Sequence, residues 1–186
     1  MTPTDRRVLL DMAISLDGYV AGPGGQDAGL YDWYFDPPAP SVLIVDELVA
    51  QTGAIVIGRG AYGSGDAGGW DDTPYRVPHV VITHRPPTVR PGRVEFVFAT
   101  DLRQGLELAT GAAGSRWETV GGGADVARQV LAAGLVDELQ LHLVPVVIGA
   151  GLRLFDGPTG AHRLDPVRVV ESIGVTHLRY RLRQPG

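Results

Sequence analysis

The sequence predicts an α/β domain with a mainly parallel central sheet, helices on both faces and an antiparallel hairpin at its C-terminal end. Strand-length apolar segments alternate with segments of helical periodicity, an order typical of a parallel sheet covered by helices. The last two apolar segments are separated only by Gly174, which is typical of paired antiparallel strands. Because the 186 residues show no repeat, linker or break in composition, a single domain spanning residues 1–186 is expected.

The first half of the chain begins with an apolar segment at residues 8–14, which reads as a largely buried strand. Residues 15–25 are too rich in glycine for a regular element. The aromatic run 31–35 is either a satellite cluster or the wall of a pocket. Prolines in 37–41 stop the preceding structure, and residues 42–51 carry the apolar stripe of a helix.

The middle of the chain contains three further strands, predicted at residues 54–57, 77–83 and 94–99. The long polar loop between the first two holds Asp71 and Asp72, which lack further ligands at a recognisable spacing. We therefore expect a solvated turn there, and no metal site. Asp101 and Gln104 resemble a capping box that opens a helix to about Thr110.

The last part of the chain has a strand at 117–120, three glycines and a helix that ends near Gly134. Residues 138–144 alternate as a half-exposed strand should. His142 falls on the polar phase of that strand, so a surface or hydrogen-bonded histidine is favoured over a catalytic one. Residues 167–173 and 175–182 form the predicted hairpin.

The composition excludes several kinds of chemistry. There is no cysteine, hence no disulfide or thiolate nucleophile, and all 16 basic residues are arginine, which removes Schiff-base and P-loop lysine chemistry. A net charge of −5 argues against broad attraction to nucleic acid. Without a long apolar run or a signal-like start, the expectation is a cytoplasmic chain with no nucleic-acid or membrane partner.

Three glycines between a strand and a helix carry the clearest chemical signal. At Gly121, Gly122 and Gly123 a ligand can approach the backbone, and the first N–H groups of the helix favour an anion such as a phosphate. The alternative is a plain tight turn, and the spacing does not match the G-x-G-x-x-G fingerprint. Two other turns that follow strands, after Gly58 and Thr83, contain arginines.

These three turns all lie at the C-terminal ends of predicted strands, where open α/β sheets bind their ligands. With Arg59 in the first turn and Arg85 in the second, the sequence predicts a cradle for a phosphate-rich cofactor.

The motifs follow a known pattern in order: Ile14–Ala21, Ile57–Tyr62, Gly121–Gly123 and Pro145–Gly151 with Leu154 and Phe155. In this pattern the chain resembles the reductase domain of bacterial riboflavin biosynthesis (the RibD C-terminal domain) and its stand-alone relatives. The resemblance implies the three-layer dihydrofolate reductase-like fold. It also implies an NADPH-dependent reductase, similar to 5-amino-6-(5-phosphoribosylamino)uracil reductase, which passes hydride to a small heterocyclic or carbonyl substrate. Such relatives often form homodimers, and an exposed strand such as 138–144 could supply the interface.

The resemblance also assigns site residues. The nicotinamide would be covered by the 15–25 loop, where Asp17 is the candidate catalytic residue that contacts substrate or relays a proton, or else only caps the turn. The other candidate substrate contacts are Ser15, Tyr19 and Trp33. The cofactor contacts implied for phosphates, adenosine ribose and pyrophosphate are Gly58, Arg59, Gly60, Thr83, Arg85, Gly121, Gly122, Gly123, Ala124 and Asp125.

Two departures leave other functions open. Ala61 stands where the family usually has threonine, and no acid stands at residues 41–42, where folate enzymes carry their pterin-binding carboxylate. Folate reduction is therefore not expected. The alternatives are a non-catalytic nucleotide-binding domain, a dihydrofolate reductase-like enzyme of different substrate, or a flavin or deazaflavin in the same cleft.

Overall fold

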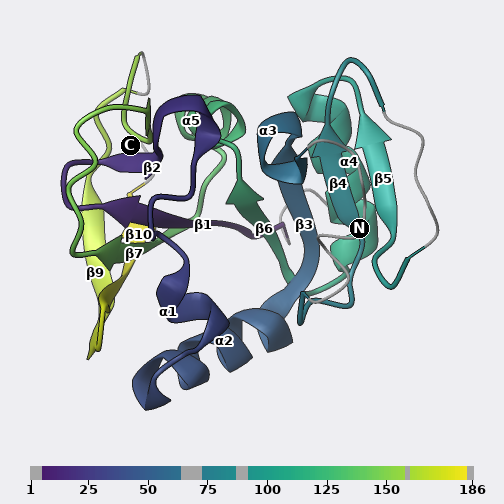
Figure 1. The fold of residues 1–186 in the computed structure, drawn as a ribbon. Helices are drawn as coiled ribbons and strands as arrows, with labels where there is room; N and C mark the ends of the chain where they lie inside the picture. The colour runs from purple at the N-terminus through teal and green to yellow at the C-terminus, as the bar shows by residue number, and fades with distance from the viewer. Residues whose placement is uncertain (1–5, 64–72, 87–91, 158–159, 184–186) are drawn as a thin grey trace.

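The computed structural model describes residues 6–63, 73–86, 92–157 and 160–183. Its centre is an eight-stranded sheet of order β5-β4-β3-β6-β1-β7-β10-β9 (Figure 1). The strands from β5 to β7 in this order pair in parallel, whereas β10 runs antiparallel to both β7 and β9. The predicted mostly parallel sheet with a C-terminal antiparallel hairpin is confirmed.

The elements have the following bounds. The strands of the large sheet are β1 (Val8–Ser15), β3 (Thr52–Gly58), β4 (His79–Ile82), β5 (Phe96–Ala99), β6 (Trp117–Gly122), β7 (Glu138–Val144), β9 (Leu164–Ser172) and β10 (Val175–Leu182). A small second sheet pairs β2 (Tyr19–Ala21) with β8 (Leu152–Arg153). The helices are α1 (Asp32–Phe35), α2 (Ala39–Gln51), α3 (Arg59–Tyr62), α4 (Leu102–Ala113) and α5 (Ala124–Ala132), with a 3-10 turn at Pro23–Gly25.

Alternate side chains of β1 show how the layers are built. Leu10, Met12 and Ile14 belong to a core cluster that includes residues of α4 and α5. Leu9 packs with residues of α2, and Ala13 packs with Trp33 of α1. Because neighbouring side chains of a strand point to opposite faces, the sheet is the middle of three layers. This confirms the predicted three-layer architecture, in which α1 and α2 lie on one face and α4 and α5 on the other (Figure 1).

The expected helix ends are present. The side chain of Asp101 accepts the N–H of Gln104 at 2.9 Å, and the side chain of Gln104 accepts the N–H of Thr100 at 2.8 Å. The two donors of a capping box are thus satisfied, with the return contact one residue earlier than in the standard motif. Gly134 follows α5 with φ 64°, the left-handed conformation that glycine allows at a helix C-terminus.

Two of the differences from the prediction have a local cause. The helix expected from residue 42 begins at Ala39, with Pro38 at its N-cap and Pro40 in its first turn, where proline displaces no helical hydrogen bond. The glycine-rich segment 15–25 does contain a regular element, β2. Gly151 makes that pairing possible, because a Cβ on it would lie 2.1 Å from the carbonyl oxygen of Ala21.

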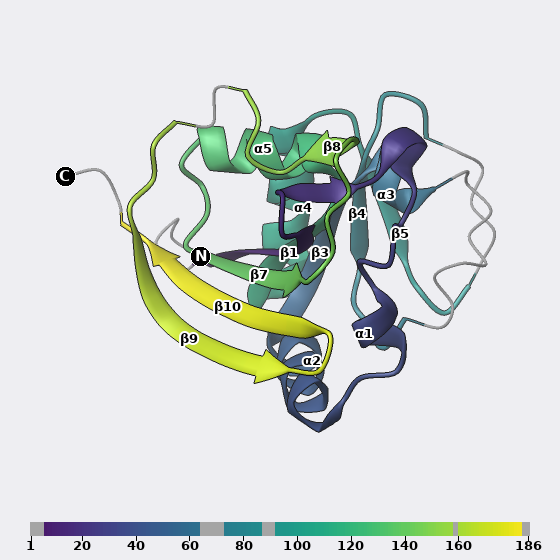
Figure 2. The same cartoon turned by 60° about the vertical axis from the view of Figure 1, so that its left-hand side comes forward.

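The strand predicted at residues 138–144 is present as β7, but its half-exposed character was wrong. Strand β7 lies between β1 and β10, and all its residues except Leu143 are buried. Its alternating polar residues therefore face polar partners inside the protein instead of water. As both edges of β7 are paired, this strand cannot supply a dimer interface. The long hairpin β9–β10 covers it and ends the sheet on that side (Figure 2).

The turn expected at Asp71 and Asp72 lies outside the described residues. Among the helices of the described ranges, none is long and apolar enough to cross a bilayer.

Candidate functional site

The three turns singled out from the sequence follow adjacent strands. In the sheet, β4, β3 and β6 are neighbours and run parallel, so their C-terminal ends meet at one edge. The helices α3 and α5 begin at that edge (Figure 1). The predicted convergence of the turns after Gly58, Thr83 and Gly121 is therefore present.

Two of these turns touch through their backbones. A Cβ on Gly123 would lie 3.1 Å from both the Cα and the N of Gly58, and Gly123 has φ +88°, which L side chains rarely adopt. A Cβ on Gly122 would lie 2.7 Å from the Cβ of Ala61, the position where the family pattern has threonine. Glycine is thus required at 122 and 123 for the close approach of the turns after β3 and β6.

Within the described part of the chain, the first N–H groups of α5 at this edge have no hydrogen-bond partner. Gly123 at the N-cap has no side chain to cap them, and the first intrahelical bond runs from the Ala127 N–H to the Gly123 carbonyl at 3.0 Å. The N–H groups of Ala124, Asp125 and Val126 precede it. The exposed Asp125 carboxylate does not block them, because it accepts a 2.7 Å bond from Gln129 on the side of the helix. Backbone and helix dipole together suit a phosphate group here.

The two arginines of the cradle differ in their surroundings. Arg59 donates to the Gly63 carbonyl, and its guanidinium lies 5.6 Å from the centre of the Tyr62 ring, so it folds back over its own turn. Arg85 is exposed. Its backbone N–H donates to the Thr83 hydroxyl at 3.2 Å. The buried Thr83 therefore shapes the turn that presents the Arg85 side chain to solvent.

The loop after β1 is fastened to the segment after β7. The Asp17 carboxylate accepts the Ser15 hydroxyl at 2.6 Å, the Ile148 N–H at 3.1 Å and the Gly149 N–H at 2.7 Å. The Ser15 hydroxyl in turn accepts the Tyr19 N–H at 2.9 Å. Ser15 and Asp17 thus fix the base of the loop that was expected to cover the nicotinamide.

The hydrogen bond from Ser15, helped by the N–H groups of Gly149 and Ile148, lowers the pKa of Asp17 to about 2. Asp17 is therefore ionised at neutral pH and holds no proton to donate. Of the two roles that the sequence left open, this geometry favours capping the turn over relaying a proton. Its catalytic role stays a prediction.

Replacing Asp17 with asparagine should loosen this loop, because a neutral amide cannot accept three hydrogen bonds as a carboxylate does. We expect faster hydrogen exchange at the Ile148 and Gly149 N–H groups, with Asp27→Asn as the control from the same region. Since the folded pKa lies below the ordinary value of 3.8, the carboxylate stabilises the fold above that pH and loses its effect as the pH falls towards 2. Unchanged exchange in Asp17→Asn would contradict this role.

The four expected substrate residues do not form one group. Tyr19 is buried and donates its hydroxyl to the Gly149 carbonyl at 3.2 Å, close to Ser15 and Asp17. Trp33 instead lies on α1 and is 6% exposed, with its ring 4.5 Å from the ring of His142. The aromatic run 31–35 is thus a short helix whose tryptophan belongs to the core.

The sequence reading missed a buried polar chain on the face of the sheet below α1 and α2. Its members are Asp11, His142, His177, Ser41 and Ser172, joined in that order by contacts of 2.9, 2.6, 3.0 and 2.9 Å. For His142 the surface interpretation is wrong and the hydrogen-bonded one is right, because its exposure is 2%. The sequence signal that indicates this polar chain is Asp11, a carboxylate in the middle of an otherwise apolar strand.

The fold is that of a dihydrofolate reductase-like α/β domain, and the edge at which the three turns meet is suited to an anion. The family model of the RibD C-terminal domain matches residues 6–178, so the chain belongs to that family. A search of curated proteins finds no match.

Solved structures confirm the fold. A protein described as a riboflavin biosynthesis protein from Shewanella sp. PV-4 has a TM-score of 0.73 at 22% identity, with 96% of this chain and 99% of that chain covered. A Thermotoga maritima deaminase/5-amino-6-(5-phosphoribosylamino)uracil reductase has a TM-score of 0.67 at 17% identity, covering 98% of this chain and 58% of the other. Dihydrofolate reductase from Enterococcus faecalis, complexed with NADP(H), has a TM-score of 0.60 at 16% identity over 96% and 97% of the two chains.

Proposed function

We propose that this chain is an NADPH-dependent reductase of the riboflavin-biosynthesis type. The observation that carries the proposal is the backbone contact between Gly58 and Gly123, which joins the N-terminus of α5 to the arginine-bearing turn after β3. The turn of Arg85 follows the neighbouring strand β4 at the same edge of the sheet. Membership of the RibD C-terminal domain family supports it. So does the likeness to a reductase from T. maritima and to a dihydrofolate reductase complexed with NADP(H).

The residues at this edge fit a dinucleotide with phosphate groups, since glycine backbone, free N–H groups and arginine are all suited to anions. When bound, NADPH supplies a hydride, and the protein contributes orientation and exclusion of water. The loop fastened by Ser15 and Asp17 would close over the reacting end beside Tyr19, and Trp33 would support the substrate side. The cofactor contacts would be Gly58, Arg59, Gly60, Thr83, Arg85, Gly121, Gly122, Gly123, Ala124 and Asp125.

Oxidation of NADPH in the presence of pterins, pyrimidines and simple carbonyl compounds tests the reaction. A reductase oxidises the cofactor with at least one of them, the expected substrate being a small heterocycle or carbonyl compound. A protein that binds NADPH and oxidises it with none would be the non-catalytic nucleotide-binding domain. Yellow colour in the purified protein would instead support a flavin or deazaflavin.

Arg85→Ala should weaken NADPH binding more than NADH binding. An exposed guanidinium at the adenosine end would pair with the 2′-phosphate that only NADPH carries. A charge-assisted hydrogen bond contributes about 1.5–3 kcal/mol, which corresponds to roughly a tenfold to hundredfold loss of NADPH affinity. Fluorescence titration measures both affinities, with the exposed Arg103→Ala as a control on α4. Equal losses for the two cofactors would rule out this role.

A homodimer and a cytoplasmic location belong to the same proposal. The interface would lie on β9 at the edge of the sheet and on the turn that follows it, because Val167 and Val169 of β9 and Ile173 of the turn are exposed by 46%, 61% and 82%. Exposed apolar side chains on an edge strand favour association with another chain. Sedimentation of the protein beside Val169→Arg tests the interface, and a wild-type monomer at micromolar concentration would contradict it.

A further inference from the structure

The polar chain from Asp11 to Ser172 connects two partly exposed ends through a buried middle. Ser41 is 0% exposed, and His142 and His177 are each 2% exposed. Asp11 on β1 and Ser172 at the end of β9 are half-buried. Four strands and α2 contribute one residue each. None of these residues belongs to the proposed cofactor edge, where the turns after Gly58, Thr83 and Gly121 meet.

The hydrogen atoms of this chain can all point the same way. Asp11 accepts the His142 Nε2–H at 2.9 Å, which leaves His142 Nδ1 as the acceptor for His177 Nδ1–H at 2.6 Å. His177 Nε2 then accepts the Ser41 hydroxyl at 3.0 Å, and Ser41 accepts the Ser172 hydroxyl at 2.9 Å. This assignment follows from the carboxylate, which only accepts when ionised. Every donor in the chain therefore points towards Asp11.

The assignment requires neutral imidazoles. Burial, and next the neighbouring His142, lower the pKa of His177 to about 4, so this ring is neutral at pH 7. Among the charged groups around it, Asp11 acts in the opposite direction and Arg168 on β9 in the same direction. A neutral ring with one N–H and one free nitrogen can receive a proton on one side and release one on the other.

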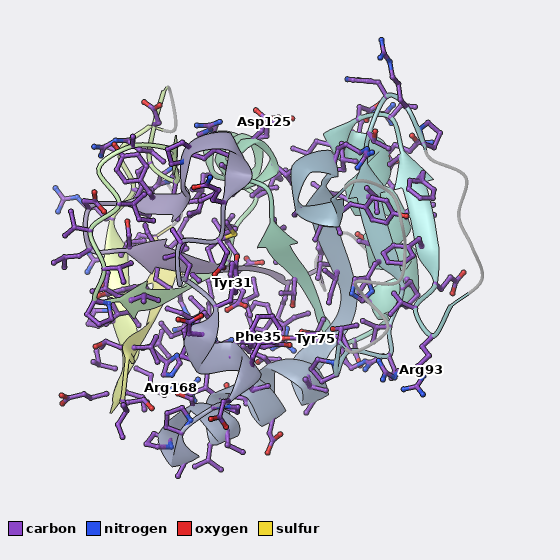
Figure 3. The ribbon with its side chains drawn as sticks, viewed as in Figure 1. Tyr31, Phe35, Tyr75, Arg93, Asp125 and Arg168 are labelled. Atoms are coloured by element: carbon purple, nitrogen blue, oxygen red, sulfur yellow. The ribbon has the colours of Figure 1, made fainter. Side chains whose placement is uncertain are left out.

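The Asp11 end opens onto a group of phenols. Its Oδ1 accepts both His142 and Gln140, the latter at 3.2 Å, whereas Oδ2 makes no hydrogen bond within the described residues. The Asp11 side chain is 16% exposed. These phenols are Tyr31, Tyr34 and Tyr75. Burial, and next the charge of Asp11, raise the pKa of all three, to about 12 for Tyr31 and Tyr34. Figure 3 shows Tyr31, Phe35 and Tyr75 gathered by α1, well below Asp125 at the cofactor edge.

This arrangement exceeds what packing needs. A buried polar network costs free energy relative to apolar side chains of the same volume unless all its members are paired. Here the network is paired throughout its buried part and ends, among the residues that the structure describes, in one carboxylate oxygen without a hydrogen bond, near the three phenols. That open oxygen is the feature which a purely structural network would not require.

We propose that Asp11 protonates the substrate and that His142, His177, Ser41 and Ser172 relay to Asp11 the proton that it passes on. The proposal rests on the proposed function in one respect: a C=N or C=O group that accepts a hydride at carbon must also gain a proton at nitrogen or oxygen. Asp11 is the catalytic residue of this step, and the other four are positioning residues that supply it.

The proton count closes. Asp11, which accepts the His142 Nε2–H, first takes that proton, and the Asp11 O–H bond so formed breaks as the substrate N–H or O–H bond forms. The His177 Nδ1 proton moves to His142, and the Ser41 hydroxyl proton moves to His177 Nε2. Ser41 takes the proton of Ser172, and water supplies Ser172. The net transfer is one proton from water to substrate, with the charge of Asp11 unchanged.

Binding of 2,4-diaminopyrimidine, a basic planar probe, tests the Asp11 end without turnover. Calorimetry in two buffers of different ionisation heat measures affinity and proton uptake together, with neutral uracil as the control ligand. The wild type should prefer the basic probe and take up protons on binding it at pH 8. Asp11→Asn should lose at least about tenfold in affinity, the equivalent of about 1.4 kcal/mol, and lose the uptake. Equal affinity and uptake in the two proteins would overturn the proposal.

Nitrogen-15 NMR of the imidazole rings tests the relay. Because the two rings form one chain, probe binding should shift the ring nitrogens of both His142 and His177 in the wild type, and of neither in Asp11→Asn. A shift confined to His142 would contradict the relay, because a structural contact needs no response from the second ring. Unchanged thermal unfolding of Asp11→Asn would exclude misfolding as the cause.

The two proposals can fail separately. If the wild type binds no NADPH but shows Asp11-dependent proton uptake, the reductase function fails and the protonating role of Asp11 stands. If NADPH binds equally to wild type and Asp11→Asn while the affinity for the probe does not depend on Asp11, only the proposed role of Asp11 and its relay is refuted.

Discussion

Gly123→Ala is expected to reduce both the stability of the fold and its affinity for NADPH. The new Cβ would lie 3.1 Å from backbone atoms of Gly58 at a residue with φ +88°. Such backbone strain costs about 1–3 kcal/mol. If the backbone moves to relieve this clash, the turn after β3 separates from the N-terminus of α5. The loss of even one hydrogen bond to a charged phosphate costs about 1.5 kcal/mol, roughly tenfold in affinity.

Two control variants separate the causes. Gly121→Ala lies in the same turn, but its nearest neighbour would be Ile55 Cγ2 at 3.7 Å, an ordinary contact. Gly134→Ala has a positive φ of +64° with nothing within 4 Å, so it measures backbone strain without a clash. Chemical unfolding should show a larger loss of stability in Gly123→Ala than in Gly121→Ala, and NADPH titration should show a loss of affinity in Gly123→Ala and none in Gly134→Ala. An equal loss of stability in Gly121→Ala would contradict the role of the close approach.

We expect Arg179→Met to destabilise the fold strongly, because it removes the charge of a buried arginine. The Arg179 guanidinium donates to Glu138 at 2.6 Å and to Glu47 at 3.0 Å, and the Arg179 and Glu138 side chains are 7% and 10% exposed. Removing one partner of a buried ion pair leaves the other charge poorly solvated and costs about 3–5 kcal/mol. Methionine keeps much of the volume, so the loss would report the charge.

Arg181→Met is the matched control on the same strand. Arg181 contacts Glu138 at 3.3 Å, but its side chain is 66% exposed, and exposed ion pairs contribute about 0–1 kcal/mol. Urea unfolding of the two variants should therefore differ by at least about 2 kcal/mol. Equal losses would mean that the buried pair stabilises the sheet no more than a surface pair does.

Most of the fold could be predicted from sequence because its signals are local. The apolar segments, the capping side chain of Asp101 and the glycine after α5 each act within a few residues of their own position. The exposure of strand β7 was wrongly predicted for the opposite reason. Its polar residues Glu138, Gln140 and His142 are satisfied by partners on β1 and β10, and a periodic pattern cannot distinguish such partners from water.

The same distinction divides the site. Gly58 and Gly123 stand at strand ends in the sequence itself, so the meeting of their turns at one edge of the sheet could be predicted. The polar chain that begins at Asp11 could not be predicted, because Asp11 and His142 are separated by 131 positions and meet only when β1 and β7 pair. Only the presence of a carboxylate in an apolar strand hints at it.

Titration of the purified protein with NADPH and NADH, followed by fluorescence, tests the central claim most directly. The proposed cofactor edge predicts saturable binding of NADPH in the micromolar range and weaker binding of NADH. No binding of either nucleotide at millimolar concentration would contradict the claim that these turns form a nicotinamide dinucleotide site.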